Sequence, residues 1–138
     1  MSLQQISIFL ENKSGRLAEV TRCLGNAGVS IRAITITDNI EFGILRLIVD
    51  KIDAAVKALT DGKFTFKLAT ILAVEVPDRP GGLADVMEIF RNEHVNIEYL
   101  YASLEKNKDS AVVIFKPKDF DHSLEIVRAK GLTIVDSL

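Results

Sequence analysis

Two stretches of the chain read almost alike: residues 15–20 are GRLAEV, and residues 81–86 are GGLADV. The register that aligns them continues without a gap to Ile31 and its counterpart Ile97. Seven positions between Gly15 and Ile31 are identical in the two copies. Self-similarity in one fixed register indicates an internal repeat. The chain is therefore predicted to be one unit of about 66 residues written twice.

Each copy predicts the same order of secondary structure. Short apolar runs bounded by turn residues predict strands, and apolar residues at steps of three and four predict amphipathic helices. The expected strands span residues 6–10, 31–37, 44–49 and 64–69 in the first copy, and 71–76, 97–104, 111–115 and 132–135 in the second. A helix is expected after the first and the third strand of each copy, which gives a βαββαβ order.

Single residues mark the expected helix ends. Gly28 suits the left-handed end of the first helix. The second helix is expected to be capped by Asp50 or Asp53 in the first copy, and by Asp119 or Asp121 in the second.

The βαββαβ order predicts an α+β fold of two ferredoxin-like units in tandem, each an antiparallel sheet with helices on one face. The expected domains are residues 1–69 and 70–138. Almost no linker separates the two copies. The domains are therefore expected to abut, with shared or exchanged strands as one arrangement of their boundary.

Composition narrows the class of protein. Of the 138 residues, 48% are hydrophobic and 26% are charged, as in an average globular protein. The net charge of −2, without a basic run, argues against nucleic acid as a partner. Neither a secretion signal nor a membrane-spanning run is recognisable, so we expect a cytoplasmic protein without membrane contact. The single cysteine, Cys23, and the two histidines offer no metal-ligand spacing, and no cofactor or metal is expected.

Three functions that this architecture can host find little support. An RNA-binding module would carry aromatic side chains on the third strand, whereas residues 44–49 have none and the second copy has only Phe115. A metal carrier would need paired cysteines before the first helix. An enzyme would need a nucleophile, a base and an orienting group, and the few cysteine and histidine residues make that improbable.

A binding site at the start of each first helix remains. Glycine before a helix lets a ligand approach the backbone, and the unpaired N–H groups of the first turn attract an anion. A carboxylate there would place its α-ammonium near Asn12 or Asp78. Ser30 and Asn96, at the start of the second strands, are expected to form the opposite wall. This arrangement suits an amino acid better than a phosphate.

Both copies resemble the ACT domain. The resemblance rests on residues 11–17 with 28–31 and on residues 78–83 with 94–97, and it covers essentially the whole chain. It implies a regulatory protein that binds amino acids between paired domains and controls a metabolic enzyme. The first copy departs from the family pattern, because Ser14 replaces a proline and Ser30 replaces an asparagine.

The ligand contacts implied by this resemblance are Asn12 or Asp78 in the loop and Ser30 or Asn96 in the strand. The candidate ligand-binding residues are Asn12, Lys13, Ser14, Gly15, Arg16, Leu17, Ser30 and Ile31 in the first copy, and Asp78, Arg79, Pro80, Gly81, Gly82, Leu83, Asn96 and Ile97 in the second. We expect a non-catalytic sensor of a free amino acid that forms a homodimer and acts on a metabolic enzyme. The alternative is an interaction subunit whose pockets are vestigial.

Several residues also have simpler explanations. Gly15 and Gly81 are the residues that a tight strand-to-helix turn needs for its own backbone. Cys23 corresponds to Ile89 in the second copy, which favours core packing. His94 and His122 are expected to be ordinary surface residues.

Overall fold

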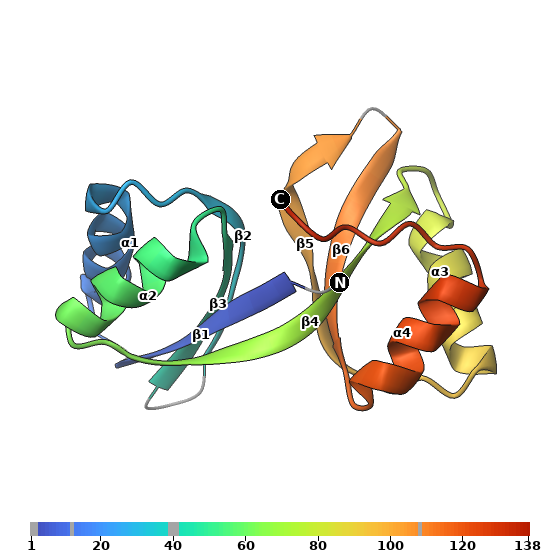
Figure 1. Cartoon of the computed structure of the whole chain (residues 1–138), viewed down its shortest axis with the longest axis horizontal. Helices are drawn as coiled ribbons and strands as arrows, with labels where there is room; N and C mark the ends of the chain where they lie inside the picture. Colours follow the sequence, from blue (N-terminus) through green and yellow to red (C-terminus); the bar gives the residue numbers. More distant parts are fainter. Residues whose placement is uncertain (1–2, 12, 39–41, 108) are drawn as a thin grey trace. The chain divides into compact units, whose positions relative to one another are not determined.

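The computed structural model describes residues 3–11, 13–38, 42–107 and 109–138 (Figure 1). Ten elements follow one another along the chain. They are β1 (Leu3–Glu11), α1 (Arg16–Asn26), β2 (Ile31–Asp38), β3 (Phe42–Val49), α2 (Ile52–Asp61), β4 (Thr65–Pro77), α3 (Gly82–Asn92), β5 (Ile97–Asn107), β6 (Ser110–Pro117) and α4 (Phe120–Ala129). Contacts between Cα atoms divide the chain into two compact units, 4–69 with 138 and 70–137 with 3.

The first unit is built around β3, which pairs antiparallel with β1 on one side and β2 on the other. Alternate side chains of β1 and β3 face α1 and α2, because successive residues of a strand point to opposite faces. The helices contribute buried residues at helical spacing, Val20 and Leu24 from α1 and Ala55 and Leu59 from α2. Both helices therefore close the same apolar core.

The second unit repeats this plan around β6, which pairs antiparallel with β4 and β5. Val86 and Phe90 of α3 and Val127 of α4 are buried against the strands. The rings of Phe90 and Phe115 lie 4.9 Å apart between centroids and anchor this core.

The prediction of two ferredoxin-like units, each with its own antiparallel sheet, is wrong. The strands follow the hydrogen-bonded order β1-β3-β2-β5-β6-β4, which closes into a barrel. The expected strands at 64–69 and 71–76 are one 13-residue strand, β4. No turn residue interrupts it, so the chain stays in the strand from one copy to the next. The strand expected at 132–135 is reduced to an isolated bridge between Val74 and Ile134.

The expected helix ends are met in part. Gly28 has a φ of 73°, which confirms the left-handed conformation after α1. Asp119 caps α4, because its side chain accepts the His122 N–H at 3.1 Å. The cap predicted for the second helix of the first copy is wrong: Lys51 holds that position without a side-chain bond, and Asp50 accepts a hydrogen bond elsewhere. In the described part of the chain, no helix is both long and apolar enough to cross a membrane.

Candidate functional site

Helices α1 and α3 begin in the same unusual way. Each is preceded by a glycine in the left-handed region, Gly15 with a φ of 87° and Gly81 with a φ of 83°. Side chains other than glycine are strained there, so the backbone of the turn alone accounts for both glycines. A glycine at this position also has no side-chain oxygen with which to cap the helix.

The first turn of each helix consequently has unpaired N–H groups. In α1, Arg16 donates its N–H to Lys13 O at 3.3 Å and Glu19 donates to Gly15 O at 2.9 Å. The N–H groups of Leu17 and Ala18, between them, find no acceptor among the residues that the structure describes. Such N–H groups lie at the positive end of the helix dipole and suit an anion.

The second copy shows the same arrangement. Gly82 donates its N–H to Arg79 O at 3.0 Å, and Asp85 donates to Gly81 O at 2.9 Å. The N–H groups of Leu83 and Ala84 are left without an acceptor within the described ranges. Each copy therefore offers two adjacent donors at the start of its first helix.

The space in front of these donors is open. A Cβ atom built on Gly15 would meet no heavy atom within 4 Å, and one built on Gly81 would meet only Arg79 Nη1, at 3.8 Å. Leu17 and Leu83, which follow the glycines, are 43% and 40% exposed. A small ligand can therefore reach both helix starts from solvent.

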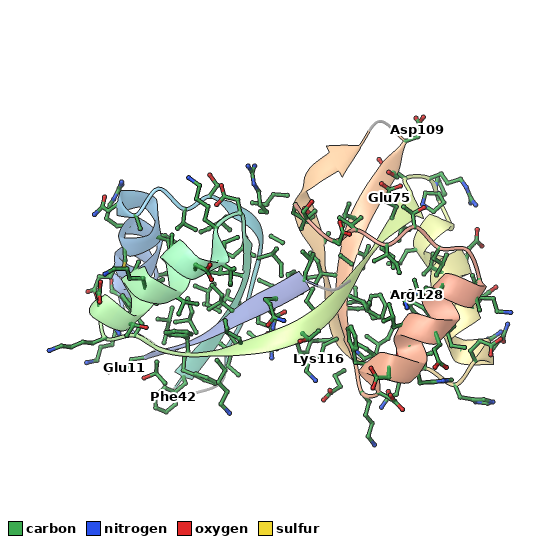
Figure 2. The ribbon with its side chains drawn as sticks, viewed as in Figure 1. Glu11, Phe42, Glu75, Asp109, Lys116 and Arg128 are labelled. Carbon is green, nitrogen blue, oxygen red and sulfur yellow. The ribbon has the colours of Figure 1, made fainter. Side chains whose placement is uncertain are left out.

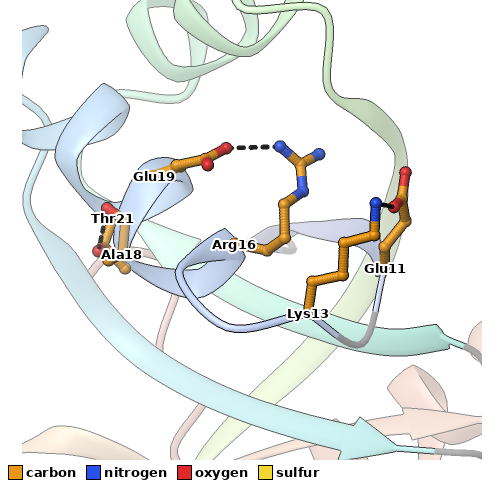
Figure 3. A network of polar contacts seen from close by, with 6 residues as sticks. All are labelled: Glu11, Lys13, Arg16, Ala18, Glu19 and Thr21. Atoms are coloured by element: carbon orange, nitrogen blue, oxygen red, sulfur yellow. Dashed lines mark hydrogen bonds and ion pairs between the residues drawn. The ribbon is translucent and has the colours of Figure 1, made fainter.

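The charged side chains beside the first helix start are paired with one another (Figure 3). Lys13 Nζ lies 2.8 Å from Glu11 Oε2, and this hydrogen bond holds the pKa of the Glu11 carboxyl below its ordinary value. Arg16 Nη1 lies 2.6 Å from Glu19 Oε2, and its guanidinium stacks 5.2 Å from the centroid of the Phe64 ring. The two cations therefore add no net charge to this entrance.

In the second copy, Arg79 plays the corresponding part. Its Nη2 lies 2.7 Å from Asp85 Oδ2, and its Nη1 donates to Pro80 O at 3.2 Å. Gly82 packs tightly: a Cβ atom there would come 2.0 Å from Pro77 O. Asp78 is exposed, and its N–H donates to Asp109 O at 2.9 Å. Of the remaining loop candidates, Ser14 and Pro80 are exposed, and Asn12 lies outside the described residues.

In each unit, the predicted opposite wall lies at the far end of the strands from the glycine loop. The end of β1 pairs with the start of β3 at Glu11 and Phe42, which lie close together in Figure 2. The start of β2 pairs with the other end of β3, at Ile31 and Val49. Seven residue steps of about 3.3 Å, or roughly 23 Å, separate the two ends of β3. Within the first copy, the structure therefore does not bring Ser30 to the Gly15 loop.

The second copy repeats this separation along β6. Pro77 pairs with Ser110 at one end, and Ile97 pairs with Pro117 at the other. Figure 2 shows Asp109 and Lys116 at these opposite ends. Ile31 and Ile97 are half-buried and pack against the two cores. Asn96 is exposed at the start of β5, away from the Gly81 loop.

Asn96 instead lines a cavity of about 540 Å³ together with His94, Lys118, Asp119 and His122. No sequence pattern places these residues together, and the sequence predicts both histidines to be ordinary surface residues. The one available signal is that His94 replaces a glycine in the register of the repeat. Cys23 is half-buried, with its Sγ 3.4 Å from Ala58 O. No metal-binding cluster of His, Cys, Asp and Glu occurs among the described residues.

Comparison with known proteins gives a family and a fold. The model of the ACT domain pair matches residues 1–137. The crystal structure of protein BT0572 from Bacteroides thetaiotaomicron has 39% sequence identity and a TM-score of 0.91, over 98% of this chain and 92% of that one.

Two more distant structures share the fold. The regulatory subunit of aspartate kinase from Thermus thermophilus, in its ligand-free form, is 17% identical with a TM-score of 0.65, over 93% of this chain and 91% of that one. The same subunit from Thermus flavus is 16% identical with a TM-score of 0.63, over 94% and 92%. No curated protein sequence matches this chain.

Proposed function

Because this chain belongs to the family of ACT domain pairs, which implies a regulatory role through small-molecule binding, we propose that it is a sensor of a free amino acid. The observation that carries the proposal is the open glycine entrance at α1 and again at α3, each with two unpaired N–H groups. We assign the two ACT domains to residues 1–69 and 70–138. We further propose that the chain has no catalytic activity of its own.

An amino acid fits the chemistry of the second entrance. The N–H groups of Leu83 and Ala84 would receive the α-carboxylate, where the dipole of α3 adds to the attraction. The Asp78 carboxylate, in the same loop, would accept from the α-ammonium. The exposed Leu83 side chain offers an apolar contact for the ligand side chain.

The ligand contacts from the strand must come from a second domain. Asn96 stands roughly 23 Å from the Gly81 loop in its own copy, which is farther than one amino acid spans. We therefore propose a homodimer in which Asn96 of one chain completes the Gly81 entrance of the other. This arrangement agrees with ligand binding between paired domains, which the family resemblance implies.

The proposed target is an enzyme of amino-acid metabolism. Regulatory subunits of aspartate kinase share this fold, and they illustrate how such a chain can serve an enzyme as a separate subunit. A second candidate is an interaction subunit with vestigial pockets. The intramolecular pairing of Lys13, Arg16 and Arg79 favours that alternative, because these cations are already neutralised.

A thermal screen of the twenty amino acids separates the two candidates. A ligand that binds only the folded state, at 100 times its dissociation constant, adds about 2.7 kcal/mol of stability. For a chain of this length that corresponds to a rise in Tm of roughly 5–10 °C. Asn96→Ala should weaken binding about 2- to 100-fold, from a neutral to a charge-assisted bond. Ser30→Ala should matter less, and Asn92→Ala, at the end of α3, is the matched control.

Mixing two defective chains tests whether the site is shared. Gly81→Val should block one side of the site, and Asn96→Ala should remove the other. A mixed dimer of the two variants has one site with both defects and one with neither, so binding at half stoichiometry should return. If no amino acid shifts the Tm, the interaction subunit is the better description. If binding occurs and does not return on mixing, the shared site is wrong.

A further inference from the structure

The cavity at the start of β5 is a second candidate binding site. It lies at the opposite end of β6 from the Gly81 loop. Its volume of about 540 Å³ lies within the range of small-molecule pockets. His94 and Asn96 line it from the loop before β5, and Lys118 and His122 line it from the start of α4. The sequence contains no other histidine, and strands β5 and β6 separate these two along the chain.

The first copy has different residues at the same places. For the residues before β2 and β5, corresponding positions are those of the sequence repeat, which aligns Ile31 with Ile97. For the residues around the starts of α2 and α4, corresponding positions follow from aligning the first helical residues, Ile52 and Phe120. They are Gly28 for His94, Asp50 for Lys118, and Ala54 for His122. All three differences place a basic or titratable side chain in the second copy.

In the first copy, this end of the unit is closed by its own hydrogen bonds. Asp50 Oδ1 accepts the Ser30 N–H at 2.9 Å, and Lys51 Nζ donates to Gly28 O at 3.4 Å. In the second copy, Lys118 uses only its backbone N–H, which donates to Asn96 O at 2.9 Å. The side chains of Lys118, His94 and Asn96 form no hydrogen bond or ion pair with any described residue.

The backbone of His94 is itself unusual. Its φ of 57° lies in the left-handed region, where the first copy has Gly28 with a φ of 73°. A bulky side chain is unfavourable in this conformation, and such positions concentrate at functional sites. The ring of His122 is held in place by the contact of its Nε2 with Glu93 O, at 3.2 Å.

The acidic groups around the cavity are mostly engaged elsewhere. Glu93 pairs with Lys130 at 3.2 Å, and Glu98 pairs with Lys116 at 2.7 Å. Asp119 accepts the backbone N–H that caps α4, and Asp121 stands in the first turn of that helix.

The Lys118 ammonium is available to a ligand. The pKa of the Glu98 carboxyl is lowered chiefly by its hydrogen bond with Lys116, and the charge of Lys118 adds to this effect. Lys118 therefore contributes positive potential to this end of the unit without forming an ion pair there.

We propose that this cavity binds a small oxyanion, a carboxylate or a phosphate group, through Lys118, His94 and His122. Asp121 also lines the cavity, and its carboxylate would repel a ligand of high negative charge. The site goes beyond the amino-acid sensor in its ligand and in its binding residues, although Asn96 belongs to both; within one chain it lies roughly 23 Å from the Gly81 entrance along β6. It would let the chain respond to a second ligand.

The two imidazoles give a direct readout, because no other histidine contributes signals. Inorganic phosphate and acetate are titrated separately into the full chain at one fixed pH, while the imidazole resonances of His94 and His122 are followed by NMR. Sodium chloride of equal ionic strength is the control. We expect the resonances of both histidines to shift along one saturable curve for at least one of the two oxyanions, because both side chains line the cavity. The stronger of the two titrations identifies the phosphate or the carboxylate as the ligand group.

Three substitutions replace cavity residues of the second copy with their counterparts from the first copy: Lys118→Asp, His94→Gly and His122→Ala. Lys118→Asp should weaken anion binding about tenfold or more, because a charged hydrogen-bonding partner is lost. His94→Gly should fold at least as well as the parent, since glycine relieves the left-handed backbone. Lys67→Asp makes the same change of charge on β4, outside the cavity, and should leave binding unchanged.

Two outcomes would overturn the proposal: shifts no larger than those with chloride, or equal binding by the parent and Lys118→Asp. The amino-acid site is tested separately, because Gly81→Val should leave the anion titration unchanged.

Discussion

Replacing Gly82 with alanine should destabilise the protein more than one methyl group ordinarily does. The new Cβ would lie 2.0 Å from Pro77 O, whereas ordinary contacts are 3.4 Å or longer. Both atoms belong to the backbone or are fixed to it, so the start of α3 must move away from the end of β4 by more than about 1 Å. Overpacking of this kind costs roughly 1–3 kcal/mol.

That cost converts to a measurable shift in Tm. At about 2.1 cal/mol/K per residue, 138 residues give an unfolding entropy of about 0.3 kcal/mol/K. Gly82→Ala should therefore lower the Tm by roughly 3–10 °C in calorimetry, and it should weaken any ligand held by the N–H groups of Leu83 and Ala84. Gly25→Ala is the matched control: a Cβ there meets nothing within 4 Å, and it should raise the Tm by about 2–3 °C. A Gly82→Ala protein as stable as its parent would refute the close approach of α3 to β4.

Three further predictions concern the cap, the ion pair and metals. Asp119→Ala should lower the free energy of unfolding by about 1 kcal/mol, or the Tm by about 3 °C, because the His122 N–H loses its acceptor. Asp119→Asn should keep most of the stability, because its side-chain oxygen can accept the same N–H. Equal Tm values for the parent and both variants would contradict the cap. The pKa of Glu11 is lowered by Lys13, so this carboxylate stabilises the fold above the ordinary glutamate pKa, and the contribution is lost as the pH falls through its lower folded-state pKa. In Lys13→Met, NMR of the Glu11 carboxyl carbon should show the pKa rising, and an unchanged pKa would exclude the pair in solution. A chelator should leave the Tm unchanged, since the described residues form no metal-binding cluster, and a fall in Tm would reveal a bound ion.

The local features of the fold follow from the sequence because they depend on neighbours along the chain. Gly15 and Gly81 mark the strand-to-helix turns, and their left-handed φ is a local requirement that the residue type reveals. The buried stripe of α3 at Val86 and Phe90 follows from helical periodicity. Such signals occur in both copies, so each copy supports the interpretation of the other.

The strand boundaries between the two copies are harder to predict from the sequence. Residues 64–69 and 71–76 each read as a strand, and nothing in them says whether the chain turns between Ala69 and Thr70 or runs on. Continuation is decided by pairing with strands far away in sequence, which local patterns do not record. The closed strand order depends on the same long-range pairing.

The site prediction joined residues that topology separates. A helix between two parallel strands carries the chain back along the sheet, so the end of one strand and the start of the next lie at opposite ends. This rule already places Asn96 far from the Gly81 loop of its own copy, and the register of β6 gives the distance. The cavity around His94 and His122 needed the structure, because its two sides come from segments that β5 and β6 separate along the chain.

The continuity of β4 has a consequence for tolerance to insertion. In most two-domain proteins, the boundary is an exposed linker that accepts tags, fluorescent proteins or proteolytic sites. Here the division between the units falls between Ala69 and Thr70, inside a strand of 13 residues. An inserted segment would interrupt that strand, so a reporter placed at this boundary should damage both halves. A loop that ends a helix, such as the connection of α2 to β4 at Gly62 and Lys63, offers a safer position.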